Sequence, residues 1–210
     1  YSQFEVPDAR RVYTTFEQPD LKSTFTLTVK APKGWKVFSN APTPAPEEEG
    51  EAWVYRFATT EVMSTYITAI VAGPYEGTTA TLTSSDGRTI DLGVYARASI
   101  VEHLDADEII EITRQGFEFF EGAYGIPYPF TKYDQIFVPE YNAGAMENAG
   151  CVTFRDAYVF RTRPTEAQME ARANTILHEL AHMWFGDLVT MKWWNDLWLN
   201  ESFAEFMSHL

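Results

Sequence analysis

The stretch from residue 164 to residue 186 constrains the fold most, because it has the pattern of one amphipathic helix. Thr165 and Gln168 have the spacing of a capping box at its start, and Gly186 is a typical helix stop. The apolar residues recur at helical spacing and are Met169, Ala173, Ile176, Leu177, Leu180 and Trp184. This stripe predicts a helix that packs one face against a core.

Two histidines lie beside that stripe in the sequence H-E-L-A-H. His178 and His182 are four residues apart, so they lie about 40° apart around the helix axis and both imidazoles can reach one metal ion. Glu179 is placed to accept a proton from a metal-bound water rather than to bind the metal. Glu201, 19 residues after His182, can supply a third ligand and leave the fourth position open. This motif alone is common by chance, but burying such groups costs free energy unless a metal pairs with them.

Three motifs in order carry a family resemblance. They are residues 144–148 (G-A-M-E-N), residues 178–187 (H-E-L-A-H-M-W-F-G-D) and residues 193–201 (W-W-N-D-L-W-L-N-E). In this order and spacing the chain resembles, over its whole length, the aminopeptidase N family of zinc metallopeptidases, which are gluzincins. The family pattern has glycine where Ser202 stands, a departure that we do not expect to remove metal binding.

The resemblance implies a zinc-dependent aminopeptidase with one Zn²⁺ per chain, held by His178, His182 and Glu201. Its substrates would be peptides with a free N-terminus. Zinc would polarise the scissile carbonyl and activate water, while Glu179 acts as general base. Carboxylates near the zinc would bind the α-ammonium and reject an internal amide, which has no charge to pair.

The resemblance also implies a set of substrate-binding residues. In the G-A-M-E-N motif, Glu147 would hold the amine, and its neighbours would bind the substrate backbone and shape the first side-chain pocket. These neighbours are Gly144, Ala145, Met146 and Asn148. Gln3 and Glu5 belong to a shorter Q-F-E segment that resembles the one completing the family's amine site. Asp187, Asn200 and Glu205 are candidates for orienting the ligands, with ordinary packing or surface roles as the alternative.

Other functions stay open at this point. A related endopeptidase or epoxide-hydrolysing enzyme would share the architecture, and a non-catalytic fragment would retain only the fold. The family uses a tyrosine after the third ligand to stabilise the oxyanion, and residues 202–210 contain none. We therefore expect the chain to be a fragment of a longer polypeptide and the parent protein to be the enzyme.

The composition of the chain limits its possible partners and its cellular location. The net charge of −14 argues against a nucleic-acid partner. Most of the acidic excess falls after residue 98, where it would favour a cationic substrate end. Cys151 is the only cysteine, which excludes an intramolecular disulfide and fits a cytoplasmic location. No apolar run approaches the ~20 residues of a membrane span.

The hydrophobic pattern changes near residue 98. Before it, residues 25–29 and 53–57 alternate as strands, residues 66–72 suit a buried strand, and the turn at 85–88 joins strands 79–83 and 89–95. After it, a helix begins at Asp105, with a stripe of Ile109, Ile112, Gly116, Phe119, Phe120 and Ala123. Strands are predicted at 135–138 and 151–154 around a loop at 144–148, followed by the two metal-binding helices.

These elements predict an α+β protein with two domains. Residues 1–98 would form the C-terminal part of an all-β N-terminal domain. Residues 99–210 would form the first part of a thermolysin-like catalytic domain, in which a small sheet packs on the metal-binding helices.

Overall fold

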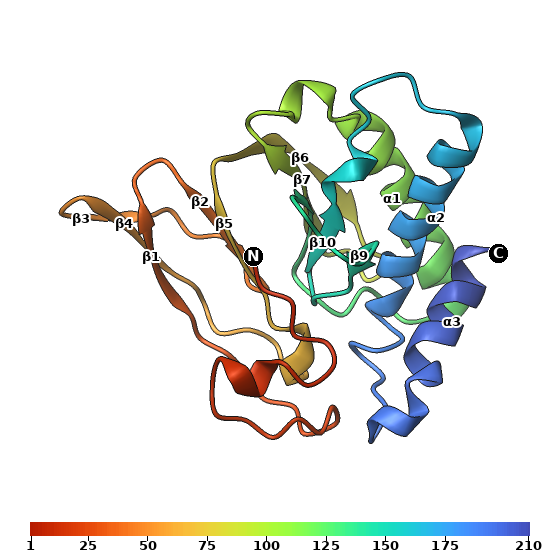
Figure 1. Cartoon of the computed structure of the whole chain (residues 1–210). Coiled ribbons are helices and arrows are strands. Elements are labelled where there is room, and N and C mark those ends of the chain that lie inside the picture. Colours follow the sequence, from red (N-terminus) through yellow and green to blue (C-terminus); the bar gives the residue numbers. More distant parts are fainter.

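The computed structural model describes all residues from 1 to 210, which form a strand-rich part and a mixed part side by side (Figure 1). The strand-rich part contains two small antiparallel sheets. One has the order β1-β4-β3, with β1 Thr28–Pro32, β3 Glu47–Glu49 and β4 Ala52–Arg56. The other pairs β2 Lys36–Ser39 with β5 Ile70–Gly73. Two 3-10 turns, η1 Ala9–Arg11 and η2 Thr65–Ile67, also belong to this part.

The mixed part is built on a five-stranded sheet of order β6-β7-β8-β10-β9. Its strands are β6 Tyr75–Thr83, β7 Thr89–Arg97, β8 Lys132–Val138, β9 Ala145–Met146 and β10 Cys151–Arg155. The pairs β7–β8 and β8–β10 are parallel, whereas β6 and β9 are antiparallel edge strands. The predicted hairpin around residues 85–88 is confirmed, with longer strands than expected.

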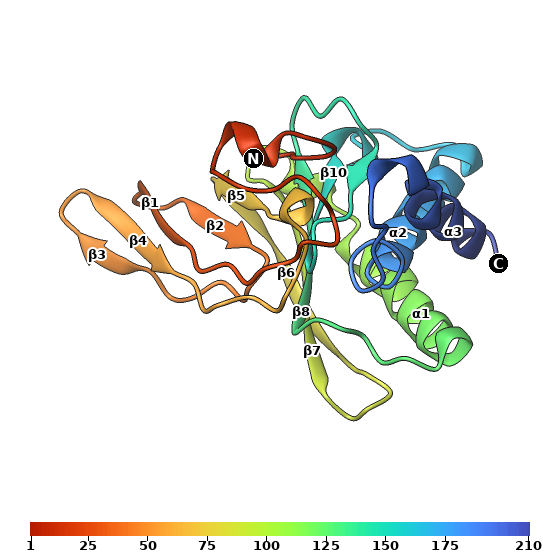
Figure 2. The same ribbon diagram turned by 90° about the horizontal axis from the view of Figure 1, so that it is seen from below.

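Three helices lie on the side of this sheet that faces away from the strand-rich part (Figures 1 and 2). They are α1 Ala106–Tyr124, α2 Glu166–His182 and α3 Trp198–Ser208. Three further 3-10 turns are η3 Val101–His103, η4 Asp156–Tyr158 and η5 Trp194–Asp196. The predicted α+β class is confirmed. None of the helices combines the length and the apolar character that crossing a bilayer requires.

Sheet pairing differs from the predicted domain division. The predicted boundary at residue 98 falls between β7 and α1, so it separates the β6–β7 hairpin from the sheet to which that hairpin belongs. Strand alternation in a sequence identifies a strand but not its partner. Here the partner is decided by the parallel register of β7 with β8, which runs from Asp91 opposite Lys132 to Ala96 opposite Phe137.

Two strand predictions are displaced. The predicted strand at 25–29 begins instead at Thr28, because residues 25 and 27 bond to residues 60 and 57 outside the regular ladder. Within the predicted strand at 66–72, Tyr66 lies in the η2 turn and β5 starts only at Ile70. A continuous apolar run marks burial without fixing the backbone conformation, and Tyr66 is fully buried.

The buried face of α1 is rotated from the predicted stripe. Phe119 is 46% exposed, whereas Phe117, which the stripe omitted, is 2% exposed. Its ring packs against those of Tyr128 and Tyr133, with centroids 4.7 and 5.6 Å away. The helix ends at Gly125, whose φ of 64° suits glycine, before the predicted stop at residues 127–130.

The start of α2 is confirmed, and its end is not. Thr165 and Gln168 form the predicted capping box. The helix stops at His182, and the chain then turns tightly, so Gly186 lies beyond the helix with a φ of 120°. Arg172 is buried and donates to Asp105 Oδ2 (2.9 Å). Asp105 therefore joins α1 to α2 and makes no side-chain cap for α1.

Buried polar side chains join the two parts of the molecule. Lys132 Nζ donates to the carbonyl oxygens of Ser39 (2.6 Å) and Gly150 (2.8 Å). Asn40 Nδ2 donates to the carbonyl oxygen of Ala149 (2.9 Å). These contacts hold the strand-rich part against residues 149 and 150, which immediately follow the G-A-M-E-N motif.

Candidate functional site

The last turn of α2 and the first turns of α3 bring the three predicted metal ligands together. His178 Nε2 and His182 Nε2 lie 2.9 Å apart, and Glu201 Oε2 lies 3.4 and 3.6 Å from them. A zinc ion about 2.0–2.1 Å from each of three donors would hold them roughly 3.3 Å apart in tetrahedral geometry. The spacing of the donor atoms therefore fits a zinc ion.

The hydrogen bonds of the two imidazoles also favour a cation. His182 Nδ1 lies 3.0 Å from the carbonyl oxygen of Phe185, which can only accept, so Nδ1 carries the proton. His178 Nδ1 donates in the same way to Glu205 Oε2 (3.1 Å). In neutral rings this leaves a lone pair on each Nε2, and the two lone pairs face each other beside a carboxylate. That arrangement is repulsive unless a proton or a metal ion lies between the donors.

The ionisation of the ligands follows the same logic. Burial by itself lowers the pKa of His182, but the carboxylates of Glu147, Glu201 and Glu179 outweigh it and raise this pKa well above its usual value. Hydrogen bonds from His178 and His182 hold the pKa of Glu201 well below its usual range. The surroundings therefore stabilise positive charge where the three ligands meet.

Glu179 points into the same site from α2. Glu179 is 5% exposed, and its Oε2 is buried without a hydrogen-bond partner. Burial raises the pKa of Glu179 well above its usual value; the carboxylates of Glu147, Glu201 and Glu5 add to this, and His182 opposes it. A carboxylate with a raised pKa is a better proton acceptor near neutral pH than an ordinary glutamate.

Three carboxylates from distant segments meet next to the ligands. One oxygen each of Glu5, Glu147 and Glu201 lies within 4.8 Å of the others. Glu147 follows β9 directly and is 3% exposed. Burial, followed by the charges of Glu147 and Glu201, raises the pKa of Glu5 to about 8. Clustered carboxylates of this kind suit a cationic group bound between them.

A cavity of about 350 Å³ contains these groups. The residues that line it are Glu5, Ala143, Gly144, Ala145, Glu147, Asn174, Thr175, His178, Glu179, His182, Glu201 and Glu205. Of the predicted substrate-binding residues, Met146 and Asn148 do not line it, because both side chains are buried in the core. Gln3 Nε2 donates to Met146 Sδ (3.6 Å) instead of facing the ligands.

The prediction missed two lining residues of α2, Asn174 and Thr175. They stand four and three residues before His178, so they occupy the same helix face one turn earlier. This spacing could have identified them. It would not have identified Ala143, which precedes the motif in an irregular segment.

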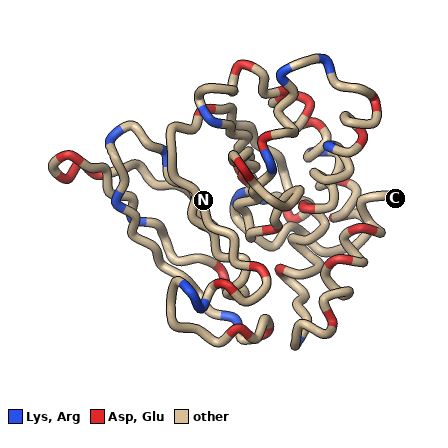
Figure 3. The backbone as a smooth tube through the Cα atoms, viewed as in Figure 1, with Lys and Arg blue, Asp and Glu red and all other residues tan.

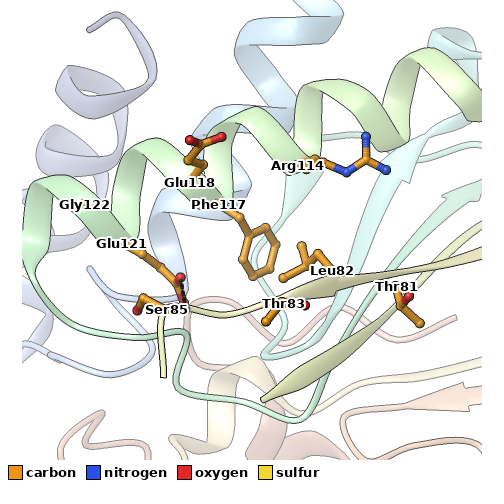
Figure 4. Close-up of a pocket in the computed structure, with 9 residues that line it drawn as sticks. All are labelled: Thr81, Leu82, Thr83, Ser85, Arg114, Phe117, Glu118, Glu121 and Gly122. Carbon is orange, nitrogen blue, oxygen red and sulfur yellow. Dashed lines mark hydrogen bonds between the residues drawn. The ribbon is translucent and has the colours of Figure 1, made fainter. Parts of the chain in front are cut away.

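A larger cavity, of about 580 Å³, lies between α1 and β6 and contains none of these groups (Figure 4). Its one buried carboxylate, Glu121, accepts hydrogen bonds from Ser84, from Ser85 and from the backbone of Tyr128. Acidic positions occur throughout the helical part (Figure 3), and the smaller cavity, unlike the larger one, combines them with histidines.

Comparison with known proteins identifies relatives of both parts. Residues 1–67 match the Peptidase M1 N-terminal domain, and residues 108–210 match the Peptidase family M1 domain. The chain is 62% identical to "Aminopeptidase N" of Streptomyces lividans over 98% of its length and 24% of that relative. It is 42% identical to "Tricorn protease-interacting factor F2" of Thermoplasma acidophilum, over 99% of this chain and 25% of the relative. It is 38% identical to human "Aminopeptidase N", over 100% of this chain and 22% of that relative. The chain thus spans about a quarter of the length of these relatives.

Proposed function

Because this chain belongs to the M1 peptidase family, we propose that the protein is a zinc-dependent aminopeptidase that removes the N-terminal residue from peptides. The observation that carries the proposal is the meeting of two kinds of group in one cavity. Three metal-ligand atoms, from His178, His182 and Glu201, adjoin the carboxylates of Glu5 and Glu147, which together with Glu201 suit a cation. A cytoplasmic location remains a prediction.

His178, His182 and Glu201 would hold one zinc ion, which when bound polarises a carbonyl oxygen and acidifies water. Glu179 accepts the proton of the attacking water and passes it to the leaving amine. Its unpartnered Oε2 is free for this proton, and burial raises its pKa, which makes its carboxylate a stronger base than an ordinary glutamate.

Glu147 and Glu5 would bind the α-ammonium of the substrate. An internal amide has no charge to pair with these carboxylates and would leave them buried and uncompensated, so an N-terminus is selected. β9 is an edge strand, so the backbone edge of Ala145 that does not face β10 is available to pair with an extended peptide. This amine site favours an aminopeptidase over a related endopeptidase or epoxide hydrolase.

The test compares a free peptide with its N-acetylated form, using the full-length protein. We expect efficient cleavage of the free peptide only, and loss of that preference in Glu147→Ala with zinc content retained. Glu170→Ala, an exposed charge on α2, is the control. Similar kcat/KM for the two substrates in the wild type would contradict the proposal and favour an endopeptidase.

The metal assignment is tested separately. We expect one zinc per chain after dialysis, and a His178→Ala, His182→Ala double variant should contain none. Zinc retained in the double variant would show that the metal lies elsewhere. Activity of the wild type that survives complete removal of zinc by a chelator would contradict a zinc enzyme.

A further inference from the structure

Asn200 lies one residue before the ligand Glu201 and contacts the amine site instead of the metal site. It is 0% exposed. Its Nδ2 donates to Glu147 Oε1 (2.9 Å) and to the hydroxyl oxygen of Tyr66 (3.3 Å). One amide therefore joins α3 to the residue after β9 and to the η2 turn of the strand-rich part.

The orientation of this amide follows from its neighbours. Turning it over would place the Asn200 carbonyl oxygen against the Glu147 carboxylate, where two acceptors would repel. With Nδ2 toward Glu147, the amide donates a hydrogen bond and brings no charge. A lysine or arginine at this place would compete with the substrate ammonium for Glu147, whereas an asparagine orients the carboxylate and leaves its charge for the substrate.

Gly186 provides the space for this arrangement. A Cβ atom at position 186 would lie 2.2 Å from Asn200 Oδ1, and the φ of 120° at this residue also disfavours any other amino acid. The same Oδ1 is buried without a hydrogen-bond partner. Since α2 ends at His182, this close approach accounts for the glycine better than a helix stop does.

We propose that Asn200 is a positioning residue that holds Glu147 in the orientation required to bind the N-terminal ammonium. The inference rests on the proposed aminopeptidase function. No other side chain hydrogen-bonds to Glu147, so without Asn200 the carboxylate can turn toward other rotamers. Because Asn200 and Glu201 are adjacent on α3, one helix then places both the amine anchor and a metal ligand.

The experiment measures kcat and KM of the full-length, zinc-loaded protein on a free aminoacyl amide and on its N-acetylated form. We expect Asn200→Ala to raise KM for the free amine by about 10- to 100-fold, the effect of one hydrogen bond to a charged group. The zinc content should stay the same and kcat should change much less. Asn200→Asp keeps the shape but places a second carboxylate against Glu147, so its KM should rise at least as much. Asn195→Ala, an exposed asparagine just before α3, should behave as the wild type.

A double-variant cycle separates positioning from a merely structural role. If Asn200 acts through Glu147, Asn200→Ala should add nothing to the KM of Glu147→Ala. Additive effects, an unchanged KM in both Asn200 variants, or a fall in kcat with KM unchanged would overturn the proposal. If Asn200→Ala does not fold, the isosteric Asn200→Asp, verified by zinc content and thermal unfolding, decides alone. Failure of the wild type to prefer the free amine would instead contradict the proposed function.

Discussion

Glu179→Gln tests the proposed chemistry with the smallest change in shape. The residue is almost fully buried, and an amide has nearly the same volume as a carboxylate. The substitution leaves the three ligands in place. It removes one property, the ability of Oε2 to accept a proton from the attacking water. We therefore expect the variant to keep its zinc and lose most of its turnover.

The structure gives a magnitude for the loss of turnover and a direction for the change in folding stability. Loss of a general base lowers the rate about 10²- to 10⁴-fold, which corresponds to roughly 2.7–5.4 kcal/mol in the activation free energy. The folding stability of the variant should instead increase. Burial raises the pKa of Glu179, so the folded protein binds this proton more tightly than the unfolded chain does. Stability therefore falls as pH rises above the ordinary glutamate pKa, and glutamine removes that loss.

The assay measures kcat on an aminoacyl amide, zinc content, and thermal unfolding of the metal-free protein at pH 7. We expect the Glu179→Gln variant to be slow, zinc-replete and at least as stable as the wild type. Glu170→Gln, on the exposed side of α2, controls for the loss of a charge on the same helix. Wild-type turnover in the zinc-replete variant would remove Glu179 from its role. A lower stability would show that its carboxylate is better compensated than its contacts indicate.

Three further variants test other features of the structure. Because the pKa of Glu5 is raised to about 8, the metal-free protein should lose stability between about pH 4.5 and pH 8; Glu5→Gln should flatten that decline in melting temperature. Phe117→Ala should lower the free energy of unfolding by about 3–5 kcal/mol in denaturant titration, since its ring is buried between α1 and the sheet; a cost below 1 kcal/mol would contradict that packing. Lys132→Met should cost about 3–5 kcal/mol by the same measurement, because it leaves the Asp134 carboxylate buried without its partner 2.7 Å away. Adding Asp134→Leu should recover part of this loss.

The sequence predicts best those features that depend only on residues close together in the chain. The helical spacing of His178 and His182 and the capping box at Thr165 depend only on neighbours within two turns, and the structure has both as expected. The predicted buried face of α1 was wrong at Phe119, because the buried arc of a helix depends on how its partners cover it. α1 lies against both α2 and the sheet, so its buried arc includes Phe117.

The G-A-M-E-N motif shows a different limit. It was predicted as a loop whose residues all bind substrate, but Ala145 and Met146 form a two-residue edge strand. Successive side chains on a strand point to opposite faces, so Ala145 lines the cavity and Met146 enters the core. A strand this short has too few residues to show alternation, and pairing with β10 alone reveals it.

The crowding of acidic groups connects the stability of the site to its proposed function. The carboxyl groups of Glu5, Glu147, Glu179, Asp187 and Glu201 influence one another, and neither oxygen of buried Asp187 has a hydrogen-bond partner. Charges held this close in a buried site destabilise the fold unless cations accompany them. A zinc ion and a substrate ammonium would bring three positive charges. A ligand that binds only the folded state stabilises it, by about 2.7 kcal/mol at 100 times its Kd. In the proposed enzyme, the repulsion that lowers the stability of the free protein would therefore become attraction for the metal and for the N-terminus.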